Sequence, residues 1–239
     1  MTITTRLETP PLPILAWRLS RFRLQAWVRR TLSTLGLRHQ AAYHLSELTI
    51  PDTEITQQVT RLVKEVSPAF LVNHSIRTYL FGAALGLRDG LRFDHEVLYL
   101  GAVMHDLGLT PHCEGSQPFE LEGAECARSF LLDRQYDSAK ADLVHEAIAL
   151  HTSMGLAMRN EPEIVLVQLG SSLDMVGLRL EDVASETMRE ILGSYPRLDV
   201  KRQMISLAQQ AVVGRPNCPL ASLMRLGFAR LVLSSPFAE

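Results

Sequence analysis

Apolar side chains recur at helical spacing along most of the chain. From residue 51 onward they fall at intervals of three and four positions, as on the buried face of a helix. No stretch alternates apolar and polar residues between turn signals, as a half-buried strand would. We therefore expect an all-α protein. The expected helices cover residues 51–66, 68–88, 95–107, 139–154, 162–177, about 182–194 and about 200–213.

Helix-start and helix-stop residues support these boundaries. Ser67 and Pro68 form an N-cap and first-turn pair, and Asp94 is a capping residue before the third expected helix. Pro162 opens the fifth helix, and Pro196 separates the last two. A long connection over residues 110–118 contains two prolines and a glycine. It is either a plain surface loop or a functional one.

The first 41 residues differ in chemistry from the rest. They hold one acid, Glu8, and seven arginines: Arg6, Arg18, Arg21, Arg23, Arg29, Arg30 and Arg38. Trp17 and Trp27 lie there among apolar residues, after a cluster of prolines that favours a helix start. We expect a basic helical extension over residues 1–41, packed on a single domain at 42–239. A transit peptide and a membrane-surface helix remain alternatives.

Composition and charge argue against some classes of function. The 239 residues are 46% hydrophobic and 21% charged, an ordinary globular composition. The net charge is −2, but residues 42–239 hold 17 basic and 25 acidic side chains, a net charge of −8. An acidic body argues against nucleic-acid binding, because phosphate contacts supply most of that affinity. A homo-oligomer formed through the arginine-rich start is an open alternative.

The cysteines and the apolar runs indicate in which cellular compartment the protein is expected. Cys113, Cys126 and Cys218 are scattered, odd in number and without a CxxC pair, so we expect neither a disulfide framework nor a thiolate zinc site. A reducing, cytoplasmic compartment fits this pattern. No apolar run approaches the length of a membrane helix, so no transmembrane segment is expected.

Several polar residues lie on apolar helical faces and suggest a metal ion. His74, His105 and Asp174 each share a face with apolar or small residues, and Asp106 adjoins His105 near a helix C-terminus, where the helix dipole disfavours a carboxylate. Each residue alone could be a satisfied core residue. Together they would cost several kcal/mol without partners, and one divalent cation would collect them all. Such nitrogen and oxygen donors suit zinc, iron or manganese.

The sequence around these residues also resembles that of a known superfamily. The chain resembles the HD-domain superfamily of metal-dependent hydrolases, and within it the branch related to cyanamide hydratase, over about residues 55–215. The runs that carry the resemblance are 73-NHSIRTYLFG-82, 102-AVMHDLGLT-110, 119-FELEGAECARSFL-131, 145-HEAIALHTS-153 and 193-GSYPRLDVKRQ-203. The resemblance implies an HD-domain helical bundle whose metal ligands are His74, His105, Asp106 and Asp174.

The same resemblance bears on the number of metal ions. Two-metal members of the superfamily carry a histidine four residues before a Gly-Ala pair, and the matching residue here is Phe119. A phenyl ring cannot ligate a metal. We therefore expect one divalent ion, with zinc as first choice and iron or manganese as alternatives. His151 is then free either to contact the residues that hold the ion or to face the substrate.

The leading hypothesis for function is water addition to a small C≡N substrate, as the branch implies. His151, Asp106 or Glu120 would move the proton, and Arg77 would hold either a ligand carboxylate or a substrate anion. The alternatives are a phosphohydrolase and a non-catalytic ligand-binding HD module. The first is weakened because none of the three lysines is near a motif. That leaves Arg77 and Arg128 as phosphate-binding candidates.

The sequence also predicts the positions of four further side chains. His112 and Cys113 could line the mouth of a substrate pocket. Glu122 could cap or orient the loop at 110–118. His145 shares its helical face with Ala141, Asp142 and Ala149, so we expect it to lie in solvent.

Overall fold

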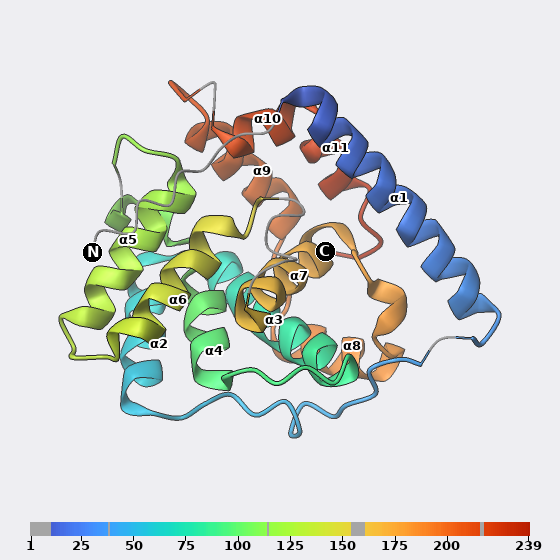
Figure 1. Ribbon diagram of the computed structural model, residues 1–239, viewed down its shortest axis with the longest axis horizontal. Helices are drawn as coiled ribbons and strands as arrows, with labels where there is room; N and C mark the ends of the chain where they lie inside the picture. The colour runs from blue at the N-terminus through green and yellow to red at the C-terminus, as the bar shows by residue number, and fades with distance from the viewer. Residues whose placement is uncertain (1–10, 38, 114, 154–160, 216–217) are drawn as a thin grey trace.

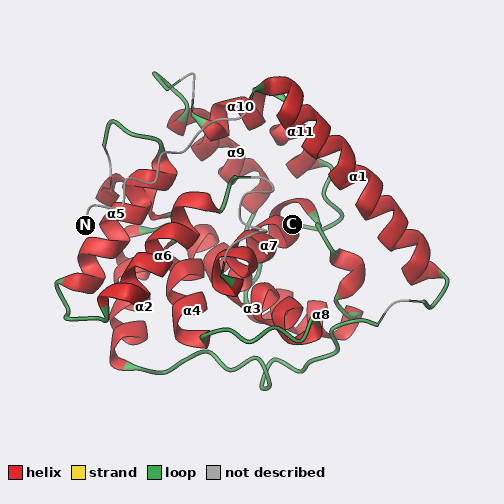
Figure 2. Cartoon of the chain, viewed as in Figure 1, coloured by secondary structure: helices red, strands yellow, loops and turns green. Residues whose placement is uncertain are grey.

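The computed structural model is an all-helical bundle, as predicted (Figures 1 and 2). It describes residues 11–37, 39–113, 115–153, 161–215 and 218–239. The described helices are α1 (Leu12–Thr34), α2 (Glu54–Val66), α3 (Ala69–Arg88), α4 (His95–Met104), α5 (Phe119–Leu132), α6 (Ser138–Leu150), α7 (Pro162–Val176), α8 (Ser185–Ser194), α9 (Val200–Ala211), α10 (Pro219–Arg225) and α11 (Phe228–Leu233). Short 3-10 turns lie at η1 (Leu107–Leu109), η2 (Pro111–Cys113) and η4 (Leu180–Asp182).

Local capping decides where the helices begin. Asp94 caps α4 as expected, because its carboxylate accepts hydrogen bonds from two backbone N–H groups of the first turn. α2 starts later than predicted, since Thr53 and Thr56 form a reciprocal capping box. Ser67 does not cap α3, whose N-cap is Pro68. The periodicity does not predict α5, α10 or α11.

α3 forms the centre of the bundle, with nearly every residue from Phe70 to Gly86 buried. Its most extensive contact is with α7; α4 packs on both of these helices, and α6 packs on α7 and α4 (Figure 1). α3 and α7 approach closely because glycines occupy the crossing. A Cβ at Gly170 would overlap the Thr78 carbonyl oxygen, and one at Gly82 would press on the backbone of Leu166. This crossing brings the polar residues of both helices together.

The N-terminal extension is helical over Leu12–Thr34, as expected. α1 runs along the outer edge of the bundle and contacts η4 (Figure 1). After α1, Ala41 forms an isolated parallel bridge with Val183 of the body. Trp17 and Trp27 remain 57% and 65% exposed. Within the described part of the chain, no helix has the length and apolar character that a bilayer crossing requires.

Candidate metal centre

The helix end at α4 explains how two adjacent residues share one site. Neighbours within a helix point in different directions, but α4 ends at Met104. His105 is the C-cap, and Asp106 has already left helical geometry with φ −107° and ψ 11°. Both side chains therefore turn into the same space, where His105 Nε2 lies 3.2 Å from Asp106 Oδ2.

His74 joins this pair from the middle of α3. Its Nε2 atom lies 3.2 Å from Nε2 of His105 and 3.5 Å from Oδ2 of Asp106. All three residues are buried, and their donor atoms form a group able to hold a metal ion. Ligand atoms at about 2.0–2.1 Å from a tetrahedral zinc ion are roughly 3.3 Å apart. The observed spacing therefore fits one divalent cation.

Hydrogen bonds on the far side of each ring decide which nitrogen faces the group. Nδ1 of His105 lies 2.7 Å from the Ala102 carbonyl oxygen, which can only accept, so this nitrogen carries the hydrogen. Nδ1 of His74 likewise lies 2.7 Å from Oδ2 of Asp174. In the neutral rings, both Nε2 atoms therefore present lone pairs to each other and to Asp106. With both rings neutral, three acceptors converge, and a cation between them would satisfy all three.

The pKa of His105 supports the neutral state of its ring. Burial, together with the nearby His74, lowers this pKa to about 3 against the opposing Ala102 hydrogen bond. A proton is therefore a poor occupant of the His105 ring at neutral pH. A metal ion is better suited, since neutral imidazole is the form that ligates metals.

Asp174 lies on the other side of His74 and is not part of the three-residue group. It is fully buried and accepts hydrogen bonds from Nε and Nη2 of Arg77, both at 2.8 Å, and from Nη1 of Arg197 at 2.9 Å. Burial alone would raise the pKa of Asp174, but Arg77 and His74 outweigh it and hold that pKa below its ordinary value. A direct ligand role for Asp174 stays a prediction.

Arg77 and Arg197 complete the surroundings of Asp174. Arg77 is fully buried and also donates to the backbone carbonyls of Tyr195 and Pro196. It thus holds a carboxylate, one of its two predicted roles, rather than facing a substrate anion. Arg197 is a residue that helical periodicity misses, because it lies between α8 and α9. The run 193-GSYPRLDVKRQ-203 was the available signal.

His151 lies beside the group, at the C-cap of α6. Its Nδ1–H donates to the Ile148 carbonyl oxygen at 2.6 Å, and its Nε2 lies 3.6 Å from Oδ1 of Asp106. Burial lowers the pKa of His151 to about 4, with a further contribution from His105. The ring contacts Phe119, which stands where two-metal relatives are expected to place a histidine. The neutral imidazole is thus an acceptor aimed at the edge of the centre.

Glu120 is buried near the same centre. Its Oε1 accepts a hydrogen bond from the Thr152 hydroxyl at 2.7 Å, while Oε2 has no partner among the described residues. Burial raises the pKa of Glu120 to about 7, although the Thr152 hydrogen bond opposes this shift. The charge of Asp106 raises it further. Glu120 is therefore the carboxyl in this region that titrates near neutral pH.

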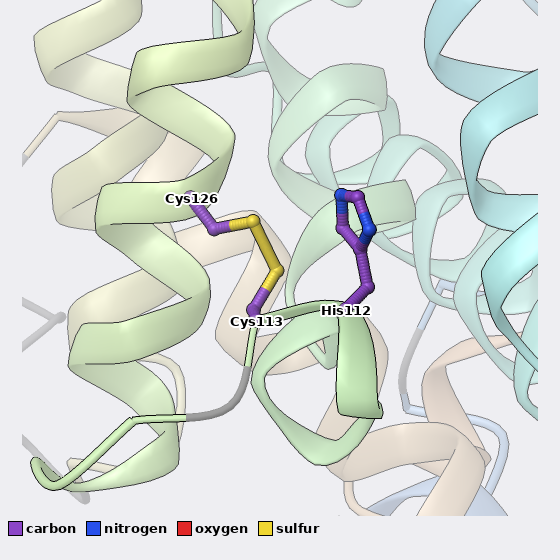
Figure 3. A group of neighbouring side chains, drawn as sticks. All are labelled: His112, Cys113 and Cys126. Carbon is purple, nitrogen blue, oxygen red and sulfur yellow. A yellow bond between two sulfur atoms is a disulfide. The ribbon is translucent and has the colours of Figure 1, made fainter.

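Two expectations about side chains are wrong. His145 is only 6% exposed rather than in solvent, and Nε2 of its ring lies 3.8 Å from a carboxylate oxygen of Glu125 on α5. The helical face of α6 could not reveal this, because α5 covers that face. Cys113 and Cys126 form a disulfide, although no spacing motif indicates one (Figure 3). The fold brings η2 back against α5.

The loop after the His105-Asp106 pair is oriented by Glu122, as predicted. The Gln117 N–H donates to Oε1 of Glu122 at 2.6 Å. His112 and Cys113 lie on η2 next to the disulfide rather than in the three-residue group. Glu114 and residues 154–160, which include the end of a predicted helix, lie outside the described residues.

Comparison with known proteins agrees with this geometry. Residues 71–183 match the family model described as "HD domain". Two proteins of Saccharomyces cerevisiae, cyanamide hydratases DDI2 and DDI3, are each 26% identical over 154 residues, which cover 62% of this chain and 68% of theirs. An uncharacterized protein of Clostridium beijerinckii is 23% identical over 104 residues, covering 42% of this chain and 66% of that protein.

The matched region spans the elements from α3 to η4 and includes every residue of the three-residue group. HD domains are usually metal-dependent hydrolases, and the buried His74, His105 and Asp106 are consistent with that chemistry. The chain is therefore an HD-domain protein, distantly related to the yeast cyanamide hydratases.

Proposed function

We propose that this protein binds one divalent cation through His74, His105 and Asp106 and adds water to a small C≡N substrate. The observation that carries the metal site is the convergence of two buried imidazole Nε2 atoms and a carboxylate oxygen, all within 3.5 Å of one another. The substrate class rests on the distant relation to cyanamide hydratases. Zinc is the first choice of metal, because the distances between the donor atoms are close to those between the ligand atoms of a tetrahedral zinc ion.

Asp174 acts in this proposal by orienting His74. It fixes the hydrogen on Nδ1, so that Nε2 faces the ion, and Arg77 and Arg197 keep it ionised. A bound divalent ion supplies the positive charge that lowers the pKa of water toward neutrality. The remaining work falls to the buried side chains around it.

Hydration of a nitrile-type carbon needs a proton acceptor on the water and a proton donor for the nitrogen. Nε2 of His151 is a free acceptor next to Asp106 and can take one proton from the attacking water. Glu120 is protonated in part at neutral pH and can give a proton to the substrate nitrogen. The C–O bond forms as one C–N π bond breaks, and a second proton shift to nitrogen yields the amide.

Product analysis with purified enzyme tests this proposal. We expect conversion of cyanamide, or of another member of a small nitrile panel, to the corresponding urea or amide. No inorganic phosphate should appear from a nucleotide panel. Elemental analysis should give about one divalent ion per chain, and the His105→Ala variant should lose both the metal and the conversion. Phosphate release without nitrile hydration would contradict the proposal, and bound metal with neither product would favour a ligand-binding module.

The phosphohydrolase alternative lacks its expected cations. Arg77 is committed to Asp174, and Nε of Arg128 lies 2.7 Å from Oδ1 of Asp142 in an ion pair. Phosphoryl transfer needs positive groups around the phosphate oxygens. The two arginines that the sequence offers for this purpose therefore have other partners, which favours a neutral substrate.

A further inference from the structure

A second cluster of metal-binding side chains lies outside the HD centre. His112 and Cys113 come from η2, and Cys126 comes from α5, on which η2 packs (Figure 3). One ring nitrogen of His112 and the two sulfur atoms lie within 4.8 Å of one another. This cluster shares no residue with the group of His74, His105 and Asp106.

The backbone holds these residues together without relying on the disulfide. η1 packs tightly on α5, because a Cβ at Gly108 would overlap the backbone of Phe119 and Gly123. The Cys113 N–H donates to the Thr110 carbonyl oxygen at 3.3 Å, which closes the turn of η2. Reduction of the disulfide would therefore leave the three residues close together on the same backbone, with the two sulfur atoms moving apart to non-bonded distance by rotation of their side chains.

The imidazole is the feature that a structural disulfide does not need. The His112 side chain is exposed and has no hydrogen-bond partner among the residues that the structure describes. Cys113 is buried, and Cys126 is partly so. An unpartnered imidazole beside two sulfur atoms at the surface provides two soft donors and one borderline donor, with one side open to water.

We propose that His112, Cys113 and Cys126, once the disulfide is reduced, bind one thiophilic divalent cation of the zinc class. Reduction adds two electrons and two protons to the sulfur atoms: a phosphine supplies the electrons, and one water supplies both protons and the oxygen of the resulting phosphine oxide. Metal binding then releases both thiol protons, because the thiolate is the ligand. The disulfide and the bound metal are mutually exclusive states of the same two sulfur atoms.

Cobalt substitution tests this site separately from the HD centre. We would reduce the full chain with a phosphine, remove the reductant anaerobically and titrate with Co²⁺. A thiolate-to-cobalt charge-transfer absorption should appear with one equivalent and disappear on adding Zn²⁺, since the HD centre contains no sulfur ligand. The oxidised protein should lack this absorption.

Single-residue variants assign the signal. Cys113→Ser and Cys126→Ser should each abolish the charge-transfer absorption of the three-donor site. His112→Ala, at an exposed position, should keep two thiolates but weaken cobalt binding by about 100-fold or more, beyond what loss of an outer-shell partner costs. The matched control is Cys218→Ser, which removes the remaining cysteine and should leave the signal unchanged.

Two results would overturn the proposal. The first is a reduced wild-type protein that binds cobalt without any charge-transfer absorption. The second is a charge-transfer absorption in Cys126→Ser that is as strong as in the wild type and forms with the same cobalt affinity. Cys126 is partly exposed, so the fold should tolerate this substitution. Far-UV circular dichroism and the metal content of the HD centre confirm that each variant is folded. Neither result would affect the proposed function, which is measured at a different site.

Discussion

At the scale of single residues, the metal centre depends on which nitrogen of each histidine carries its hydrogen. His74, His105 and His151 each turn Nδ1 toward an oxygen acceptor, and each presents Nε2 to the centre or its edge. The identities of His74, His105 and Asp106 could be predicted from the sequence. The orientation of the rings could not, because it depends on a carbonyl at the helix end and on a carboxylate from another helix.

Asp174 provides the sharpest residue-scale test. We expect Asp174→Asn to lower metal affinity by roughly 10- to 100-fold, because the amide no longer fixes His74 as the carboxylate does. The site should still load at high metal concentration, unlike that of His105→Ala. Competition with a chromogenic chelator measures both affinities.

The matched control for this test is Asp142→Asn, which removes a carboxylate from an ion pair with Arg128 outside the centre. Its metal affinity should equal that of the wild type. If Asp174→Asn instead abolishes binding as completely as His105→Ala, Asp174 is a direct ligand, as the resemblance to HD proteins implies.

The raised pKa of Glu120 predicts that the stability of the metal-free protein depends on pH. Its pKa is about 7 when folded and near 4.5 when unfolded, so the unfolded chain loses this proton first. The stabilisation is complete below pH 4.5 and is lost as the pH rises through 7. This pKa difference corresponds to about 3 kcal/mol in total, of which about 2–3 kcal/mol falls between pH 5 and pH 8.

Urea denaturation at pH 5 and pH 8 checks this prediction. The free energy of unfolding of the wild type, relative to Glu120→Gln, should fall across this interval by that amount. The comparison cancels the opposite contributions of the buried histidines. Glu65→Gln, at an exposed position of α2, serves as the control and should follow the wild type. A wild type and Glu120→Gln with parallel pH profiles would refute the raised pKa.

At the scale of helices, two features make the centre. α4 ends where the site begins, so two adjacent residues point the same way, and α3 crosses α7 closely enough for His74 to meet Asp174. Most of the long helices were predictable because their periodicity is sustained, although the 14-residue α5 was not. α10 and α11 were not, since helices this short take their stability from tertiary packing rather than from sequence pattern.

The close crossing of α3 and α7 can be tested at Gly170. Gly170→Ala should lower the free energy of unfolding by about 1–3 kcal/mol, because its Cβ meets the Thr78 carbonyl of α3. It should also weaken metal binding, since it separates His74 from Asp174. Gly193→Ala in α8 is the control: its Cβ would meet no atom within 4 Å, and alanine favours helix by up to about 1 kcal/mol. Equal stability of the two variants would contradict the tight crossing.

At the scale of the whole molecule, α1 stands apart from the bundle that holds the centre. The chain has two tryptophans, and both lie exposed on α1. Tryptophan emission should therefore be typical of indole in water, be quenched efficiently by acrylamide and stay unchanged on metal loading. Fluorescence spectroscopy measures these three properties. During urea unfolding, emission should change little while circular dichroism at 222 nm records loss of the bundle.

A truncated chain beginning at residue 40 provides the control, because it lacks α1 and both tryptophans and should retain the metal centre. Strongly blue-shifted, quencher-resistant emission from the full chain would contradict the exposed position of α1. Such emission would show that its apolar face is covered, as it would be in a homo-oligomer formed through this helix.

The sequence alone determined the all-α class, the main helices, the HD family and the side chains that form the metal group. Helical periodicity predicts the class and the main helices, because it shows which face of its own helix a residue occupies. The HD family and its ligand set came from the resemblance of the motif runs to that superfamily. Only the tertiary structure decided that Arg77 and Arg197 bind Asp174, that His145 is buried and that Cys113 meets Cys126. Those outcomes depend on what a neighbouring helix or loop brings to that face, and periodicity within one segment carries no information about its neighbours.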